Sequence, residues 1–302
     1  MTCAVVVTFN RKELLANNIE MLLRQKCPID RIIIVDNHST DGTYDFLQIK
    51  GWLSGVFSYI DTQSNIGGAG GFYIGMKAAY DEGADWIILM DDDGCAADEY
   101  TYQRLMQHAE DLHQRNVQGG KLFVNCLVQQ QEMLSFKLGH LNTVDEALKA
   151  QEEGIIIREA NPFIGTAVSR ELVEAIGVPN PDFFITGDEV DYKHRALKAG
   201  AFVGTVVEAR YNHPRPDTRE KRVLGVTVPY IVEAPWKEYY TARNFTYMYK
   251  REKQYKAILF ELVFVKVLAI LSHRCRKFKT IKMLCMGIKD GWEGRLGATV
   301  QP

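Results

Sequence analysis

The sequence lacks the cysteine patterns of zinc proteins and of small disulfide-stabilised domains. Its six cysteines are scattered over the 302 residues from Cys3 to Cys285, and none of them forms a CxxC pair. This spacing excludes the usual zinc-binding and disulfide frameworks. Free thiols in a reducing cytoplasm are the expected state. The first residues enter an apolar run without a charged leader, so we expect no signal peptide.

A large excess of charge of one sign is also absent. The formal net charge is −2, which argues against a general nucleic-acid-binding protein. No GxGxxG motif follows the first predicted strand, which makes a dinucleotide-binding dehydrogenase the least favoured enzyme class. Residues 255–271 are strongly apolar, but Glu261 and Lys266 interrupt them, so they fall short of a membrane-spanning helix.

The chain does contain enough apolar material for a large core, since 46% of its residues are hydrophobic. Short β-branched runs alternate with helical patterns, which is typical of βαβ units and predicts an α/β fold with a mostly parallel sheet flanked by helices. Strands are predicted at residues 3–9, 31–36, 57–61, 86–90, 163–169 and 201–207, with weaker ones within 121–128. Helices are predicted at residues 12–25 (capped by Asn10), 44–49, 72–82, 98–115, 170–176, 188–200, 236–253 and 255–271. We predict one domain over residues 1–216 and a mostly helical, basic and aromatic region over residues 217–302.

The most informative segment is Trp86–Gly94, in which a buried strand runs directly into three carboxylates, Asp91, Asp92 and Asp93. Ionised carboxylates this close repel one another unless a cation lies among them. Oxygen ligands suit a hard divalent ion, Mg²⁺ or Mn²⁺, which often holds substrate phosphates as well. The alternative is an acidic loop on the surface. We favour the metal site because ligands usually bind at the ends of strands in open α/β sheets.

Polar loops follow the other early strands, and in a parallel sheet these loops meet at one edge. Asp36 can accept hydrogen bonds from a base or ribose, although it can equally serve as a helix cap. The glycine-rich segment Asn65–Gly71 is predicted as a loop whose backbone can approach a ligand closely. The candidate nucleotide contacts are Thr8, Asn10, Arg11, Asp36, Asn37, Ser39, Asn65, Gly67, Gly68 and Asp92.

A second acidic cluster, Asp188, Glu189 and Asp191, stands at the start of a predicted helix. The helix dipole stabilises negative charge there, so these acids can have a purely structural role. They can also supply a general base for an attacking hydroxyl, with a neighbouring acid holding that hydroxyl. His213 follows the next strand, where its ring can complete the metal shell with a nitrogen ligand.

Four segments in order resemble family 2 glycosyltransferases of the GT-A fold, in particular the bacterial galactofuranosyl- and rhamnosyltransferase branch. They are Val5–Arg11, Val35–Thr43, Asn65–Phe72 and Asp91–Asp93, and the resemblance covers about residues 3–215. It implies that Asp91 and Asp93 form the DxD metal motif and that His213 matches a metal-ligand His of some members. It implies nucleotide contacts from Thr8, Asn10, Arg11, Asp36 and Asn65. It places Glu189 at the usual catalytic-base position, where the family more often has Asp, so Asp188 and Asp191 stay open as alternatives.

The reaction that the resemblance implies is an inverting transfer, dependent on Mn²⁺ or Mg²⁺, from a nucleotide-diphosphate sugar. UDP-galactofuranose is the first choice of donor and dTDP-rhamnose the second, with a hydroxyl of a lipid-linked or cell-surface polysaccharide as acceptor. A non-catalytic nucleotide-sugar sensor or membrane scaffold is the alternative from another class. A sugar nucleotidyltransferase ranks lower, because no glycine follows the first strand within Thr8–Lys12.

The C-terminal region carries an uneven charge, with eleven Lys or Arg against two acids between Lys250 and Lys289. A basic cluster that includes Arg274 and Arg276 follows the apolar segment 255–271, a combination suited to lying in the plane of an anionic membrane. A helix packed on the main domain is an equally weighted alternative, and a second copy can pair through the aromatic residues. We expect a cytoplasmic protein on the inner face of the cell membrane. Tyr239–Asn244 resembles a segment of the same branch without an assigned role.

Overall fold

The computed structural model describes residues 1–223, 226–231, 233–272 and 277–301. The chain divides into two compact units. The first unit consists of Met1–Ile66, Gly71–Pro179 and Tyr192–Arg215. The second unit consists of Gly67–Gly70, Asn180–Asp191 and Pro216–Pro302.

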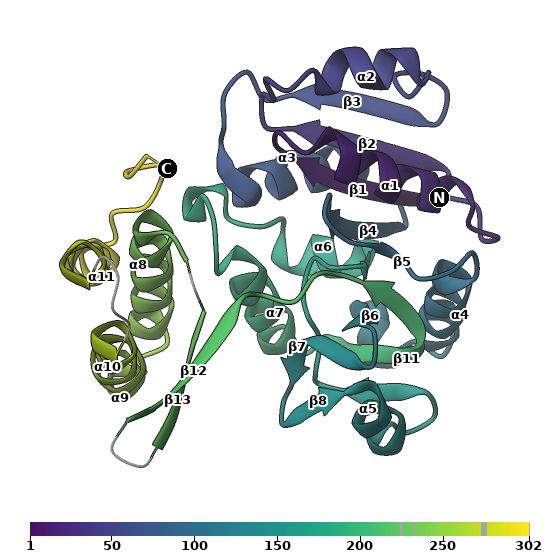
Figure 1. Ribbon diagram of the computed structural model, residues 1–302. Helices are drawn as coiled ribbons and strands as arrows, with labels where there is room; N and C mark the ends of the chain where they lie inside the picture. Colours follow the sequence, from purple (N-terminus) through teal and green to yellow (C-terminus); the bar gives the residue numbers. More distant parts are fainter. Residues whose placement is uncertain (224–225, 232, 273–276, 302) are drawn as a thin grey trace. The chain divides into compact units, whose positions relative to one another are not determined.

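An eleven-stranded mixed sheet forms the centre of the first unit (Figure 1). Its main path has the order β3-β2-β1-β4-β10-β6-β11-β5. The first four strands of that path run parallel, whereas β10 is antiparallel to both of its neighbours. The strands are β1 (Thr2–Thr8), β2 (Arg31–Asp36), β3 (Phe57–Asp61), β4 (Trp86–Asp91), β5 (Cys95–Ala96), β6 (Leu122–Gln130), β7 (Met133–Leu138), β8 (Leu141–Thr143), β9 (Ile155–Ile157), β10 (Thr166–Ser169) and β11 (Phe202–Asn212).

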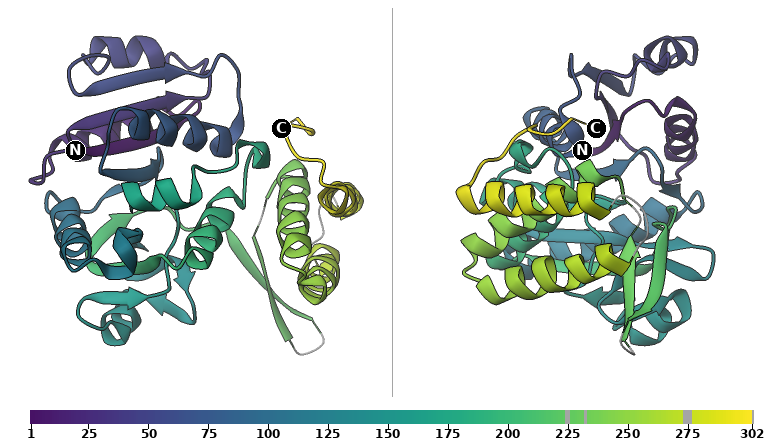
Figure 2. Two further views of the ribbon diagram at one scale, coloured as in Figure 1. Left: turned by 180° about the vertical axis from the view of Figure 1, so that it is seen from behind. Right: turned by 60° about the vertical axis from the view of Figure 1, so that its left-hand side comes forward.

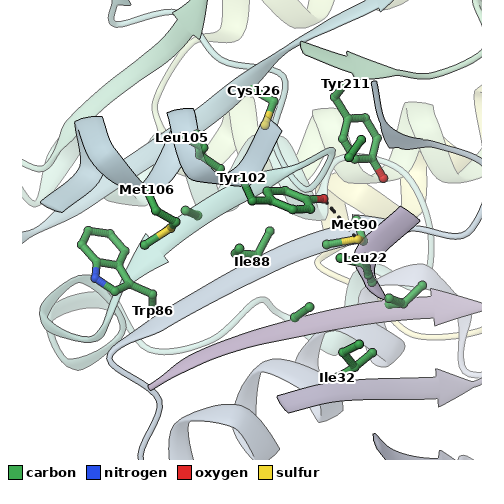
Figure 3. Close-up of a cluster of buried hydrophobic side chains, with 14 of the residues drawn as sticks. Leu22, Ile32, Trp86, Ile88, Met90, Tyr102, Leu105, Met106, Cys126 and Tyr211 are labelled. Atoms are coloured by element: carbon green, nitrogen blue, oxygen red, sulfur yellow. Dashed lines mark hydrogen bonds between the residues drawn. The ribbon is translucent and has the colours of Figure 1, made fainter. Parts of the chain in front are cut away.

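Helices cover both faces of this sheet, because its strands are apolar on both sides. Ala4 and Val6 of β1 belong to one apolar cluster, whereas Val5 and Val7 belong to the other, as the period of two along a strand requires. The first cluster includes Leu22, Tyr102 and Met90, and the hydroxyl of Tyr102 lies 3.6 Å from the sulfur of Met90 (Figure 3). The helices of this unit are α1 (Lys12–Leu23), α2 (Thr43–Ile49), α3 (Gly67–Asp81), α4 (Thr101–Gln114), η1 (Val117–Gly120), α5 (Val144–Ala150), α6 (Arg170–Ile176) and α7 (Asp188–Lys198), of which α3 and α7 begin within the second unit.

Two predicted features at helix starts are wrong. Asn10 does not cap α1, whose N-terminus has no side-chain cap. Asn10 instead has a positive φ of 53°, and its side-chain oxygen accepts a hydrogen bond from the backbone of Thr40 at 2.7 Å. The glycine-rich segment is not a loop up to Gly71, because α3 already begins at Gly67.

The early start of α3 has a packing reason. An added Cβ would lie 2.5 Å from a Val7 methyl at Gly71 and 2.3 Å from a Val5 methyl at Gly75. Both distances are too short for carbon atoms in contact, so the absent side chains let α3 lie directly on β1. At Gly71, therefore, the glycine serves the contact between helix and sheet.

The second unit is a helical assembly with a separate two-stranded hairpin, β12 (Thr218–Val223) and β13 (Val226–Ile231). Gly287 and Gly291 bring α11 against α8, because a Cβ would lie 2.3 Å from the carbonyl oxygen of Tyr239 and 2.2 Å from that of Arg243. Figure 2 shows this helical group from two further sides. Its elements are η2 (Pro181–Phe183), α8 (Pro235–Arg251), α9 (Tyr255–Ala257), the π-helix η3 (Ile258–Val265), α10 (Lys266–Ser272) and α11 (Lys277–Glu293).

None of the helices in the described part of the chain is both long and apolar enough to cross a bilayer. The apolar segment predicted at residues 255–271 forms α9, η3 and α10 without interruption. Of the basic cluster predicted to follow it, Arg274 and Arg276 lie outside the described residues.

Candidate active site

The acidic turn after β4 is held in place by a buried amide. Asn18 of α1 is 1% exposed. Its Nδ2 donates hydrogen bonds to the carbonyl oxygens of Asp91 at 3.0 Å and Gly94 at 2.6 Å. A backbone turn pinned at both ends has little freedom, so the carboxylates that it carries are presented in one arrangement.

Three of the predicted side chains come together at this turn. One ligand atom each from Asp91, Asp93 and His213 all lie within 4.8 Å of one another. Nε2 of His213 lies 3.1 Å from Oδ1 of Asp93. Nδ1 of the same ring lies 2.7 Å from the carbonyl oxygen of Pro214, to which it donates its proton. In the neutral ring the second nitrogen therefore carries the lone pair on the side of the two carboxylates, which is the usual orientation of a metal-binding histidine.

This donor set fits a divalent cation. Oδ1 of Asp93 is buried and makes no hydrogen bond of ordinary geometry within the described residues, although it lies 3.1 Å from Nε2 of His213. A buried carboxylate oxygen in that state is costly unless a positive charge is bound beside it. Two carboxylates and one imidazole suit Mn²⁺ or Mg²⁺.

The local electrostatics keep the Asp93 carboxylate ionised. Burial raises the pKa of Asp93, but the neighbouring His213 and Arg11 outweigh it and hold that pKa below its ordinary value. Burial lowers the pKa of His213, but Asp93 outweighs it and the pKa is raised. At neutral pH Asp93 is thus an anion ready to bind a cation.

Asp92, the middle residue of the triplet, is occupied by contacts within the protein. It is 3% exposed, and its oxygens accept hydrogen bonds from Oγ1 of Thr8 at 2.8 Å and from Arg11 at 3.1 Å. Burial raises its pKa, although both partners lower it in part. Arg11 also reaches Oδ2 of Asp93 at 3.0 Å. Asp92 therefore joins the triplet to the end of β1, and its nucleotide contact stays a prediction.

The predicted nucleotide residues of the first two loops are linked to one another. Asp36 is 1% exposed and accepts hydrogen bonds from the backbone of Ser39 at 2.9 Å and from the hydroxyl of Tyr59 at 2.8 Å. The hydroxyl of Ser39 accepts one from the backbone of Asn10 at 2.8 Å. The backbone of Asn37 donates to the carbonyl of Thr8 at 2.9 Å. The structure thus gathers the ends of β1, β2 and β4 at one edge of the sheet.

The remaining nucleotide candidates lie around the start of α3. Asn65 is in the segment between β3 and α3, and Gly67 and Gly68 are in the first turn of the helix. A Cβ on Gly67 would lie 1.9 Å from the carbonyl oxygen of Phe184, so this glycine is required by the adjoining chain. Gly68 has no atom within 4 Å of such a Cβ, so a side chain there would meet open space.

The second acidic cluster lies in the second unit, at the start of α7. Asp191 is 1% exposed and forms an ion pair with Arg251 at 2.6 Å. Asp188 is also buried, at 4% exposed. Glu189 is half-buried, and its Oε2 accepts a hydrogen bond from the backbone of Gly187 at 2.8 Å. Of the three acids, Glu189 has the most accessible carboxylate.

Comparison with known proteins decides the family. The model of glycosyl transferase family 2 matches residues 3–163, more than half of the chain. The chain belongs to glycosyl transferase family 2. It is 31% identical over 259 residues to galactofuranosyltransferase GlfT1 of Mycolicibacterium smegmatis, a match that covers 82% of each chain. It is 22% identical over 303 residues to dTDP-rhamnosyl transferase RfbF of Shigella flexneri, covering 97% of this chain and 96% of that protein. The predicted enzyme class and branch are confirmed.

Several solved structures share the fold of this family 2 member. Mannosyltransferase PcManGT from Pyrobaculum calidifontis, in complex with GDP-Man and Mn²⁺, has a TM-score of 0.53 at 14% identity and covers 99% of this chain and 76% of that one. S. aureus TarS 1-349 has a TM-score of 0.52 at 12% identity, with coverage of 97% and 72%. The predicted GT-A fold with a helical C-terminal extension is confirmed.

Several residues that shape this site were missed from the sequence. Asn18 and Tyr59 hold the acidic turn and Asp36, and Ser135 donates a hydrogen bond at 2.5 Å to the carbonyl of His213. Asn18 had a detectable signal, because it is a polar residue between Leu15 and Leu22 on the apolar face of its helix. The other two carry no such signal, since their partners are remote in sequence.

Proposed function

We propose that this glycosyltransferase transfers a sugar with inversion from a nucleotide-diphosphate donor, in a reaction that depends on a divalent cation. The observation that carries the proposal is the convergence of Asp91, Asp93 and His213 at the edge of the sheet. A cation bound there supplies positive charge that offsets the negative charge growing on the leaving diphosphate. The loops that hold Asp36, Ser39 and Asn10 support a nucleotide placed at the same edge.

Glu189 is the proposed general base. It takes the proton from an acceptor hydroxyl while that oxygen attacks the anomeric carbon from the side opposite the diphosphate. Its half-buried carboxylate and its place in the first turn of a helix support this role. Asp191 is the weaker candidate because Arg251 already neutralises it.

We favour UDP-galactofuranose as donor and dTDP-rhamnose second, with a lipid-linked or cell-surface glycan as acceptor. The support is the similarity to a galactofuranosyltransferase at 31% identity and to a dTDP-rhamnosyl transferase at 22%. Faster turnover of dTDP-rhamnose than of UDP-galactofuranose with the same acceptor panel would reverse this order.

Transfer measured with and without EDTA tests the cation. We expect chelation to abolish transfer and Mn²⁺ to restore it. Asp93→Asn removes the ligand charge and should lower kcat by about 10²-fold or more. Asp98→Asn is the matched control, because this carboxylate pairs with Arg104 on the surface. Full activity in EDTA would overturn the metal dependence, and donor binding without turnover would favour the sensor alternative.

We also propose that the protein works at the cytoplasmic face of an anionic membrane. The surface of α9 and η3 exposes Leu259 (67%), Phe260 (62%) and Phe264 (60%), and Lys256 is exposed beside them. Apolar side chains next to a basic one suit the boundary between acyl chains and anionic headgroups. A lipid-linked acceptor would be met there.

A further inference from the structure

Two neighbouring residues of α8, Arg243 and Asn244, are entirely buried and polar. Most of their side-chain hydrogen bonds within the described residues go to one short stretch of backbone or to each other, and Nη1 of Arg243 also donates to the carbonyl of Gly297 and to Oγ1 of Thr299. Nε of Arg243 donates to Oδ1 of Asn244 at 2.8 Å. Because a guanidinium can only donate, this bond fixes which end of the Asn244 amide faces Arg243.

The Nδ2 end of that amide faces residues 183–186, which directly precede the turn that carries Glu189, the proposed base. Nδ2 of Asn244 lies 3.0 Å from the carbonyl oxygen of Phe183, 3.0 Å from that of Ile185 and 2.7 Å from that of Thr186. Nη2 of Arg243 donates to the carbonyls of Asp182 at 3.1 Å and Phe183 at 2.9 Å. Residues 182–186 are thus wrapped around two side chains of α8.

Residues 182–186 contain backbone conformations that are unfavourable in an isolated chain. Phe184 and Thr186 have positive φ values of 62° and 65°. Left-handed backbone is unfavourable for any residue other than glycine, and most of all for a β-branched one such as Thr. The converging donors of Asn244 and Arg243 provide the interactions that hold it. Gly187 follows with φ 94°, and the next two residues are Asp188 and Glu189.

The same segment also holds the start of α3. The carbonyl oxygen of Phe184 accepts a hydrogen bond from the backbone of Ala69 at 3.1 Å. Two turns further along α8, Arg251 forms the ion pair with Asp191 on the other side of Glu189. Residues of α8 therefore hold the chain both before and after Glu189. The segment before Glu189 is also hydrogen-bonded to the first turn of α3.

We propose that Arg243 and Asn244 are positioning residues of the transferase, which set the place and direction of the Glu189 carboxylate by holding residues 182–186. The inference rests on the proposed function only in taking Glu189 as the base. It gives a role to two residues, Arg243 and Asn244, of the segment Tyr239–Asn244.

Asn244→Asp tests the proposal with almost no change of shape. It turns the donor that faces three carbonyl oxygens into an acceptor, so the segment must move away. We expect kcat to fall by about 10²-fold, as for a base displaced by about 1 Å, while KM for the donor stays within about threefold. Hydrogen exchange should become faster in residues 182–190 and stay unchanged in β1 and β4.

Tyr240→Phe is the matched control. It lies on the same helix, is equally buried, and loses two hydrogen bonds, both with the backbone of Val300, while its ring keeps the contact with Phe184. Its kcat and its exchange at 182–190 should match those of the wild type. Arg243→Lys keeps the charge but replaces the several N–H donors of the guanidinium by a single ammonium group. It should lower kcat and speed up exchange at 182–190 less than Asn244→Asp does.

Two results would overturn the proposal: an Asn244→Asp enzyme with unchanged kcat, or faster exchange spread equally over the whole protein. If Asn244→Asp does not fold, Arg243→Lys decides by the same two measurements. Failure of the proposed function is distinguishable. If the wild type shows no transfer, the Asn244→Asp variant should still show faster hydrogen exchange in residues 182–190.

Discussion

Nδ1 of His213 donates to the carbonyl of Pro214, and this single hydrogen bond decides which ring nitrogen faces Asp91 and Asp93. A lone histidine after a strand is an ambiguous signal, because either nitrogen can carry the proton. The carbonyl of His213 is fixed in turn by Ser135. At the scale of the residue, then, the carbonyl of Pro214 selects the tautomer of His213, and Ser135 holds the backbone of that histidine in place.

The same scale separates the three acids at the start of α7. Glu189→Gln keeps the shape and removes the proposed base, so we expect transfer to fall by about 10³-fold with unchanged stability. Asp191→Asn removes the buried charge that pairs with Arg251, which keeps only Glu252 as its carboxylate partner among the described residues, and should lower the free energy of unfolding by about 1–3 kcal/mol. Transfer assays and urea unfolding of both variants check this. An Asp191→Asn protein of full stability without transfer would identify Asp191 as the base.

At the scale of the element, α3 shows how a glycine-rich segment can serve packing. Val5 and Val7 of β1 occupy the volume in which side chains at residues 75 and 71 would lie. From the sequence alone we predicted a ligand-binding loop here. A glycine-rich segment has the same composition whether it binds a ligand or packs closely on a strand. Only the register of α3 on β1 distinguishes them.

Gly75→Ala tests this packing. The added methyl would lie 2.3 Å from Val5, so helix and strand must separate, and we expect a loss of about 1–3 kcal/mol in the free energy of unfolding. Gly68→Ala in the same helix meets nothing within 4 Å and should be neutral or slightly stabilising. Urea unfolding measures both, and equal stabilities would contradict the packing role.

Element boundaries were predicted well wherever the signal was local. The strands Arg31–Asp36 and Phe57–Asp61 have the predicted bounds, since continuous β-branched and apolar runs fall between turn residues. The hairpins β7/β8 and β12/β13 were not predicted. Their strands mix polar and apolar residues, so no continuous apolar run marks them, although each strand pairs with its neighbour in the sequence.

At the scale of the whole molecule, the exposed apolar surface of α9 and η3 is the feature that the fold itself leaves unexplained. The double variant Phe260→Ser, Phe264→Ser should lose binding to vesicles that contain phosphatidylglycerol. Ile49→Ser, at a residue 85% exposed on α2, is the control and should bind normally. Wild-type binding should weaken as salt rises, because the basic part of the attraction is screened.

Flotation with anionic and neutral vesicles measures this binding, and sedimentation velocity measures the oligomeric state beside it. Unchanged flotation of the double variant would refute the membrane proposal. A wild-type dimer that the double variant dissociates would assign the surface to a second copy of the chain.

The sequence by itself determined the family, the order of the early strands and helices, and the acidic turn after β4, because these depend on neighbours along the chain. The tertiary structure decided which acid is paired with Arg251 and why Asn244 is buried. It also separated Asp92, which is bound to Thr8 and Arg11, from the pair that faces His213. Hydrogen bonds and ion pairs between residues far apart in the sequence form only when the chain is folded, and no local pattern carries their geometry.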